Sequence, residues 1–182
     1  MFEYFTYLAD QLDISIFAYD YIGYGLSQNL KPREKLCYES FETVMYHLLY
    51  NLNINATDIC LVGHSLGTGI VVDYISKNNW VTPCILISPY KSICRIVADT
   101  CSMRLVDKFE SIQKISTINC PIKIFHGKSD KLILISHSIE LYKQLKDKSL
   151  EPVWFEGIGH NDILSSITKD HYMQVLNHLS NI

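Results

Sequence analysis

The sequence predicts an α/β fold in which a mostly parallel sheet is covered by helices on both faces. Short apolar runs bounded by Gly, Pro, Asp or Asn alternate with segments of helical periodicity along the chain. Such alternation is typical of parallel sheets with crossover helices. No internal repeat, charge block or linker-like stretch divides the 182 residues, so we expect one domain spanning 1–182.

The predicted elements follow from local patterns, taken in chain order. The chain opens in a helix whose apolar face is Tyr4, Phe5, Leu8 and Leu12. Further helical periods run from Phe41 to Leu52, from Ile70 to Ile75 and from Tyr172 to Leu179, and Asp107 with Glu110 resembles a capping box. Weak periodicity over 90–106 predicts a small excursion or lid. The predicted strands are Ile14–Tyr19, Ile59–Gly63, Cys84–Ser88, Ile122–His126 and Val153–Glu156.

Composition and charge exclude several classes of function. With 16 basic and 19 acidic residues the net charge is −3, which argues against a nucleic-acid partner. No apolar run approaches the roughly 18 residues of a membrane span, and the amino terminus lacks the pattern of a signal peptide. The six cysteines form no C-x-x-C pair, and no His, Cys and Asp cluster has metal-ligand spacing. We therefore expect a cytoplasmic protein with reduced cysteines, no metal and no cofactor.

The sequence Gly63-His64-Ser65-Leu66-Gly67 is the strongest functional signal. It follows a predicted strand and precedes a helical period, which is the context of a nucleophile elbow. Glycines suit so tight a turn because they have no Cβ. The turn would hold the Ser65 hydroxyl out at the top of the sheet, and the Leu66 N–H at the helix start could donate to an oxyanion.

A serine nucleophile needs a base and an acid that orients the base. His160 lies in the loop after the last predicted strand, and Asp130 lies four residues beyond Ile122–His126. Both therefore belong to the carboxyl edge of the sheet, where α/β proteins bind ligands. The order Ser65, Asp130, His160 is that of α/β hydrolases. Asp162 is a backup acid close to His160 in sequence, and Asp20 precedes Ser65, which is the wrong order for this fold.

Gly23-x-Gly25 follows a predicted strand and superficially matches a dinucleotide fingerprint. Gln28 stands where the third glycine belongs, and Pro32 disfavours an immediate long helix. We interpret the segment as a turn packed under the predicted catalytic edge. His126 is expected to hydrogen-bond the loop that follows it, and His64 to shape the pocket.

Four motifs together resemble the α/β-hydrolase superfamily, and most closely the α/β-hydrolase-domain 17 group of protein depalmitoylases and the related Bem46-like proteins. The resemblance covers nearly the whole chain, in order. It implies a serine hydrolase of esters or thioesters, acting on a small acyl ester or an acylated protein, with Ser65, Asp130 and His160 as triad. The motifs are Asp20-Tyr21-x-Gly23-Tyr24-Gly25-x-Ser27, Gly63-His64-Ser65-Leu66-Gly67, His126-Gly127-x-x-Asp130 and Glu156-Gly157-x-Gly159-His160-Asn161-Asp162.

The sequence departs from this family at its start. Family members carry strands before the first helix, and a His-Gly loop there donates the second oxyanion N–H. Here Met1 begins within that helix and no glycine precedes Gly23, so we expect an amino-terminally truncated hydrolase fold without that loop. The alternative to an esterase is a non-catalytic remnant that acts by binding or has no activity.

Overall fold

The structure is a computed structural model that describes residues 2–27, 30–97, 107–145 and 149–179. Its centre is a parallel sheet whose strands lie side by side in chain order. The strands are β1 (Leu61–His64), β2 (Cys84–Ile87), β3 (Ile122–Gly127) and β4 (Val153–Phe155). Because neighbouring strands are parallel, the chain crosses back over the sheet between one strand and the next. The carboxyl ends of the strands therefore all lie at one edge of the sheet.

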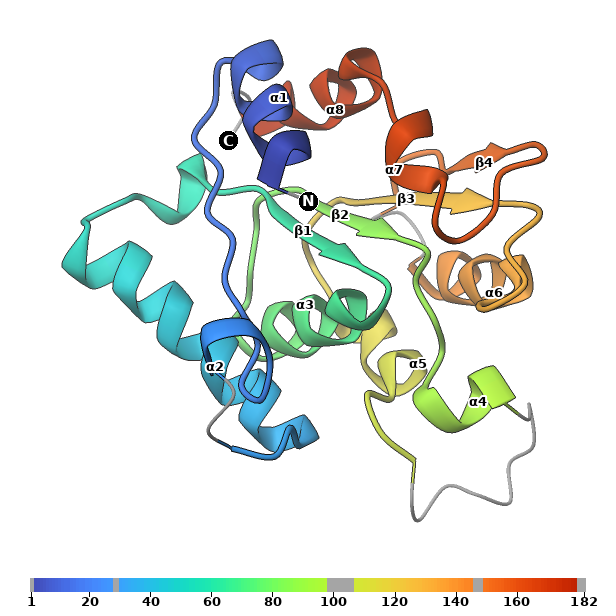
Figure 1. Cartoon of the computed structure of the whole chain (residues 1–182), viewed down its shortest axis with the longest axis horizontal. Coiled ribbons are helices and arrows are strands. Elements are labelled where there is room, and N and C mark those ends of the chain that lie inside the picture. Colours follow the sequence, from blue (N-terminus) through green and yellow to red (C-terminus); the bar gives the residue numbers. More distant parts are fainter. Residues whose placement is uncertain (1, 28–29, 98–106, 146–148, 180–182) are drawn as a thin grey trace.

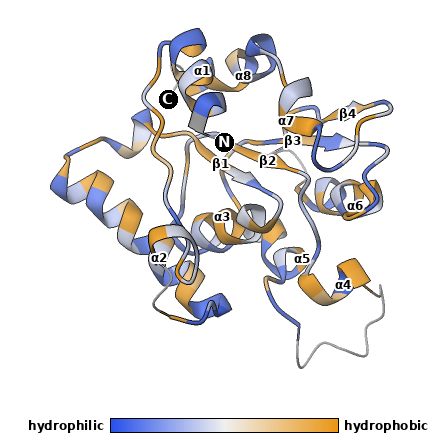
Figure 2. Ribbon diagram, viewed as in Figure 1, coloured by the Kyte–Doolittle hydropathy of each residue, from blue (hydrophilic) through white to orange (hydrophobic). Residues whose placement is uncertain are grey.

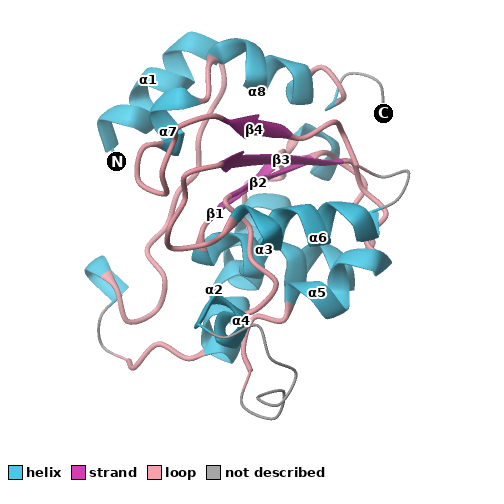
Figure 3. Cartoon of the chain, turned by 90° about the vertical axis from the view of Figure 1, so that its right-hand side faces the viewer, coloured by secondary structure: helices cyan, strands magenta, loops and turns pink. Residues whose placement is uncertain are grey.

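Helices cover both faces of this sheet, as expected (Figures 1 and 3). One layer holds α1 (Phe2–Leu12), α7 (Ile163–Ser166) and α8 (Lys169–Leu176). The opposite layer holds α2 (Glu34–Tyr46), which continues as a π-helical turn (His47–Asn51), with α3 (Leu66–Lys77), α5 (Ser111–Lys114) and α6 (Ile135–Leu145). The short helix α4 (Ile93–Val97) lies outside these layers in Figure 1.

Each face of the sheet has its own apolar core. Leu86 and Ile124 point toward α3 and the helices beside it, whereas Ile85 and Phe125 point toward α1 and α8. This alternation along each strand explains why both faces are apolar and why the strands appear in the sequence as continuous apolar runs. Figure 2 shows the apolar residues concentrated where helices meet the sheet.

The segment Ile14–Tyr19 is not a strand, contrary to the sequence prediction. It runs past the β1 edge of the sheet (Figure 1), and within the described residues its backbone makes one hydrogen bond, from the Ile14 N–H to the Ala9 carbonyl. An extended segment becomes a strand only when a neighbour accepts and donates along its length. Phe17 in this segment and Val62 on the edge strand are each more than half exposed.

Two smaller predictions also need correction or restriction. Asp107 and Glu110 form no capping box: the Asp107 carboxylate accepts from the Cys94 and Lys108 N–H groups, and Glu110 caps α5 without a side-chain bond. Of the excursion predicted over 90–106, the part up to residue 97 contains α4, and 98–106 lie outside the described residues.

Searching the described residues reveals no helix that is long and apolar enough to cross a membrane. The cysteines in the same part of the chain form no disulfide, and Cys101 falls outside it. Cys84 and Cys120 pack in the core, where both are fully buried with their sulfur atoms 3.8 Å apart.

A buried carboxylate ties the helices of one layer together. Asp73 on α3 is only 2% exposed, and its two oxygens accept from Lys114 of α5 at 2.6 Å and Lys77 at 2.7 Å. Lys114 also donates to the Tyr38 hydroxyl of α2 at 3.3 Å, and Tyr38 donates to Glu34 at 2.8 Å. The network satisfies a charge that would otherwise be costly to bury.

We expect Lys114→Met to destabilise the fold by about 1.5–3 kcal/mol, the range for a hydrogen bond to a charged partner. Lys77 is more exposed, at 53% against 27%, and bridges residues of one helix, so Lys77→Met should cost less than about 1 kcal/mol. Urea unfolding of both variants measures the difference. Equal losses would contradict the role given to Lys114.

Candidate active site

Ser65 occupies a strained turn between β1 and α3. Its φ of 51° and ψ of −117° lie outside the regions that side-chain-bearing residues favour. The Ser65 N–H donates to the Ile87 carbonyl of β2 at 2.9 Å, which anchors the turn to the sheet. A Cβ on Gly63 would lie 2.7 Å from the Gly67 carbonyl, so the turn has no room for a side chain there. The predicted elbow is therefore present, with its hydroxyl beyond the strand end.

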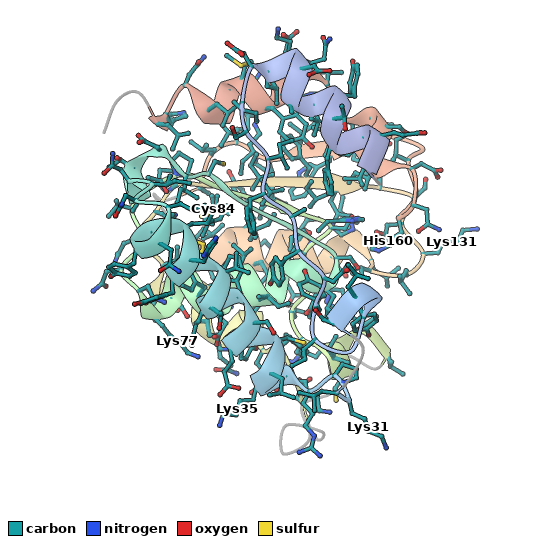
Figure 4. The ribbon with its side chains drawn as sticks, turned by 60° about the vertical axis from the view of Figure 1, so that its left-hand side comes forward. Lys31, Lys35, Lys77, Cys84, Lys131 and His160 are labelled. Atoms are coloured by element: carbon teal, nitrogen blue, oxygen red, sulfur yellow. The ribbon has the colours of Figure 1, made fainter. Side chains whose placement is uncertain are left out.

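His160 bridges Ser65 and Asp130. Its Nδ1 lies 2.7 Å from Asp130 Oδ2, and its Nε2 lies 3.0 Å from Ser65 Oγ. A carboxylate can only accept, so Nδ1 carries a proton, and in the neutral ring Nε2 is then the acceptor that faces the serine hydroxyl. Figure 4 places His160 at the opposite end of the sheet from Cys84, which begins β2. The structure thus brings the three predicted residues together in one hydrogen-bonded chain.

The Asp130 carboxylate is fully buried and heavily hydrogen-bonded. Its Oδ1 accepts from the Leu132 and Ile133 N–H groups at 2.9 and 2.8 Å. Burial alone would raise the pKa of Asp130, but hydrogen bonds from His126, His160 and Ile133 outweigh it and hold that pKa well below its ordinary value. Asp130 is therefore an anion that can fix the His160 tautomer and stabilise a positive imidazolium.

The loops that carry Asp130 and His160 are bonded to each other through their backbones. The Lys128 N–H donates to the Phe155 carbonyl at 2.8 Å, and the Ser129 N–H donates to the Ile158 carbonyl at 3.0 Å. Gly127 permits this approach, because a Cβ there would lie 2.2 Å from the Ile158 carbonyl oxygen. The end of β3 and the loop after β4 therefore set the distance between acid and base.

Two further histidines border the triad. His126 is fully buried; its Nε2 donates to the Ile133 carbonyl at 2.8 Å and lies 3.4 Å from Asp130 Oδ2. The expected bond to the following loop is confirmed, but sequence reasoning missed the contact with the acid. His64 stacks on His160 with ring centroids 5.5 Å apart. Burial, aided by His160, lowers the pKa of His64 to about 4, so it is neutral at physiological pH.

The backbone N–H next to Ser65 in the chain, that of Leu66, is not used within the described part of the fold. Leu66 is the first residue of α3, and no group in the described part of the chain accepts its N–H. Free N–H groups in the first helical turn, together with the positive end of the helix dipole, favour a negative charge there. This is the position predicted for the Leu66 donor.

The alternative acids do not reach the base. Asp162 is the N-cap of α7, and Asp20 Oδ2 accepts from the Leu26 N–H at 3.1 Å. Both nitrogens of His160 are already bonded to Ser65 and Asp130. The Asp20 turn includes Gly23 and Gly25, both at positive φ, and matches the tight turn expected from the sequence.

The described residues contain no group of three or more His, Cys, Asp or Glu side chains that could hold a metal. Two cavities lie away from Ser65. One of about 280 Å³ is lined by Ile22, Ser27, Leu30 and Ser40. The other, of about 250 Å³, lies between the π-helical turn and the end of α3. Closer to the triad, Leu132 and Leu134 follow Asp130 and are each 58% exposed.

The chain is similar to several α/β-hydrolase proteins over nearly its whole length. A protein of Acanthamoeba polyphaga mimivirus named alpha/beta hydrolase L404 is 50% identical over 178 residues, covering 98% of this chain and 68% of that protein. Human alpha/beta hydrolase domain-containing protein 17C is 36% identical over 90% of this chain and 49% of its own length. The chain thus spans about half the length of the vertebrate relatives. No family model matches it.

Solved structures share the fold at low sequence identity. The esterase domain of a Rhodothermus marinus protein superimposes with a TM-score of 0.72 at 14% identity, covering 98% of this chain and 81% of that domain. The Agrobacterium tumefaciens protein ATU1826 gives 0.73 at 14% identity, with 98% and 77% covered. At these identities the likeness shows a common fold alone.

Gly127→Ala is expected to separate the acid and base loops, because the new methyl group would overlap the Ile158 carbonyl. We predict a loss of about 1–3 kcal/mol in stability, as for other forced overlaps in packed sites. The rate of Ser65 labelling by a fluorophosphonate should fall at least tenfold. Both are measurable, by urea unfolding and by mass spectrometry.

Gly159→Ala is the matched control. Its Cβ would come no closer than 3.3 Å, to the Asp162 carboxylate, and its φ is not positive. Labelling should stay within about twofold of the parent. If the two alanine variants label equally fast, the contact at Gly127 does not set the triad geometry.

Proposed function

Because the chain belongs to the α/β-hydrolase family, we propose that it is a serine hydrolase that cleaves carboxylic esters or thioesters. The hydrogen-bonded chain from Ser65 through His160 to the buried Asp130 carries this proposal. A serine at a strained elbow, a neutral imidazole nitrogen facing it and a buried carboxylate behind are the parts that acyl transfer requires.

In the first half-reaction, Ser65 Oγ attacks the acyl carbonyl carbon while His160 Nε2 takes the hydroxyl proton. The carbonyl π electrons move to oxygen, which the Leu66 N–H meets as an oxyanion. When the tetrahedral intermediate collapses, the bond to the leaving group breaks. His160 returns its proton to the departing alkoxide or thiolate, and Ser65 is left acylated.

In the second half-reaction, a water molecule replaces the alcohol or thiol. His160 removes a proton from this water, whose oxygen attacks the acyl carbon, and collapse releases the carboxylic acid with Ser65 regenerated. Asp130 keeps its charge throughout and stabilises the imidazolium formed in each half. The scheme needs neither metal nor cofactor.

The substrates that suit this site are a small acyl ester or an acylated protein. The exposed Leu132 and Leu134 next to Asp130 offer apolar surface for an acyl chain at the open edge of the site. A cytoplasmic site of action is part of the proposal, supported by the free thiols.

The competing proposal is that the protein retains the hydrolase fold and these residues but does not turn over a substrate. The proposed scheme uses the Leu66 N–H as its backbone oxyanion donor, and loss of a single donor typically lowers turnover 10²- to 10³-fold. A reactive Ser65 distinguishes the two proposals, because a protein that only binds has no need of an activated hydroxyl.

Ser65→Ala should abolish covalent labelling by a fluorophosphonate and leave the far-ultraviolet circular dichroism unchanged. Ser129→Ala is the control: Ser129 is an exposed serine on the same rim, beside Asp130, and should label at the parental rate. Peptide mapping by mass spectrometry locates the adduct. A parent protein that never labels would favour the non-catalytic alternative.

Hydrolysis of p-nitrophenyl acetate should rise with pH through the range in which a histidine base loses its proton, ordinarily about 6.5. Asp130 and His64 do not supply this rise: the pKa of Asp130 lies below its ordinary value, and that of His64 lies near 4, so neither changes charge between about pH 5 and 9.

Consequently, His64→Phe, which keeps a ring against His160, should leave the midpoint of the profile in place. Asp130→Asn should lower the plateau by orders of magnitude, by favouring the wrong tautomer. A flat profile, or one whose midpoint moves with His64→Phe, would assign the base elsewhere.

A further inference from the structure

The hydroxyl of Tyr21 lies beside the first turn of α3. A Cβ on Gly67, the second residue of that helix, would lie 2.8 Å from this oxygen, so the phenol reaches the helix where glycine leaves its backbone bare. In the described structure the Tyr21 hydroxyl has no hydrogen-bond partner, and its oxygen is not fully buried. In contrast, the hydroxyl of Tyr90, which lies beside Gly69 of the same helix, donates to the Leu66 carbonyl at 3.3 Å.

Tyr21 is held in this place before any substrate binds. Its carbonyl accepts from the Tyr24 N–H at 2.9 Å, within the turn that Asp20 closes by accepting from Leu26. Its ring meets Tyr19 edge to face, with centroids 5.3 Å apart. A donor fixed in this way costs no reorganisation when charge appears on a substrate, which is the condition for strong electrostatic stabilisation.

We propose that the Tyr21 hydroxyl donates the second hydrogen bond to the oxyanion formed at Ser65, opposite the Leu66 N–H. The inference rests on the proposed acyl transfer and adds a catalytic residue to it. The N–H groups of the first turn of α3 mark where negative charge is favoured, and Tyr21 is an unpaired neutral donor beside that turn.

The phenol transfers no proton in this role. When Ser65 attacks, the carbonyl electrons move onto oxygen and Tyr21 keeps its O–H bond while donating to the new charge. Burial raises the pKa of Tyr21, so the hydroxyl stays protonated in the pH range of the reaction. When the intermediate collapses, the charge leaves and the hydroxyl returns to its unpaired state.

Tyr21→Phe tests the proposal by removing one oxygen atom that has no hydrogen-bond partner among the described residues. We expect kcat for p-nitrophenyl acetate to fall about 10²-fold, the usual cost of one oxyanion donor, with KM and the thermal midpoint little changed. Inhibition by a boronic acid, which forms a tetrahedral adduct with the serine, should weaken by a similar factor. A purely structural tyrosine would change neither quantity.

Tyr19→Phe is the matched control, because the Tyr19 hydroxyl is buried and also without a partner in the described structure, and Tyr19 lies two residues before Tyr21. It should retain kcat within about twofold. If Tyr21→Phe keeps kcat within about threefold of an active parent, or if Tyr19→Phe lowers kcat as much as Tyr21→Phe does, the role assigned to Tyr21 is wrong. The proposed function would still stand in either case. A parent chain without any esterase activity would overturn the proposed function and this assignment together.

Discussion

Parallel pairing of β1, β2, β3 and β4 is the constraint on which the remaining structure depends. Because the strands run in one direction with closely matched ends, Gly127 of β3 is paired with Phe155 of β4, and His64 of β1 with Ile87 of β2. Ser65, Asp130 and His160 follow strands that end at a single edge of this sheet, although they are up to 95 residues apart in the chain. Each core on either side of the sheet stabilises the alignment that creates the site.

Fine positioning depends on backbone contacts that only glycine permits. Gly63 lets the elbow close, Gly67 lets Tyr21 approach α3, and Gly127 lets the Ile158 carbonyl reach the Ser129 N–H. Around these turns, histidine rings and fixed N–H donors surround one buried anion, Asp130. Hydrogen bonds therefore stabilise the negative charge of Asp130. The start of α3 beside Leu66 favours a second negative charge.

Much of this arrangement follows from the sequence, because strand ends and tight turns leave strong local signals. The elbow at Ser65, the order of acid and base, and helices on both faces were all predictable in this way. Ile14–Tyr19 was predicted wrongly because an apolar run shows propensity for a strand but cannot show whether a neighbour is present to pair with it. The contacts of His64 and His126 with the triad also escaped prediction, since they depend on ring orientation in three dimensions. For Tyr21 the only signal was an aromatic residue directly after Asp20, within the turn.

The central claim is that the 182-residue chain holds His160 between Ser65 and Asp130 in the resting state. Proton NMR in water tests it directly, because a proton held between His160 Nδ1 and a buried carboxylate resonates far downfield of the amide region. The account predicts such a resonance in the parent and in Ser65→Ala, and its loss in Asp130→Asn. A well-dispersed spectrum of the folded parent without that resonance would contradict the account.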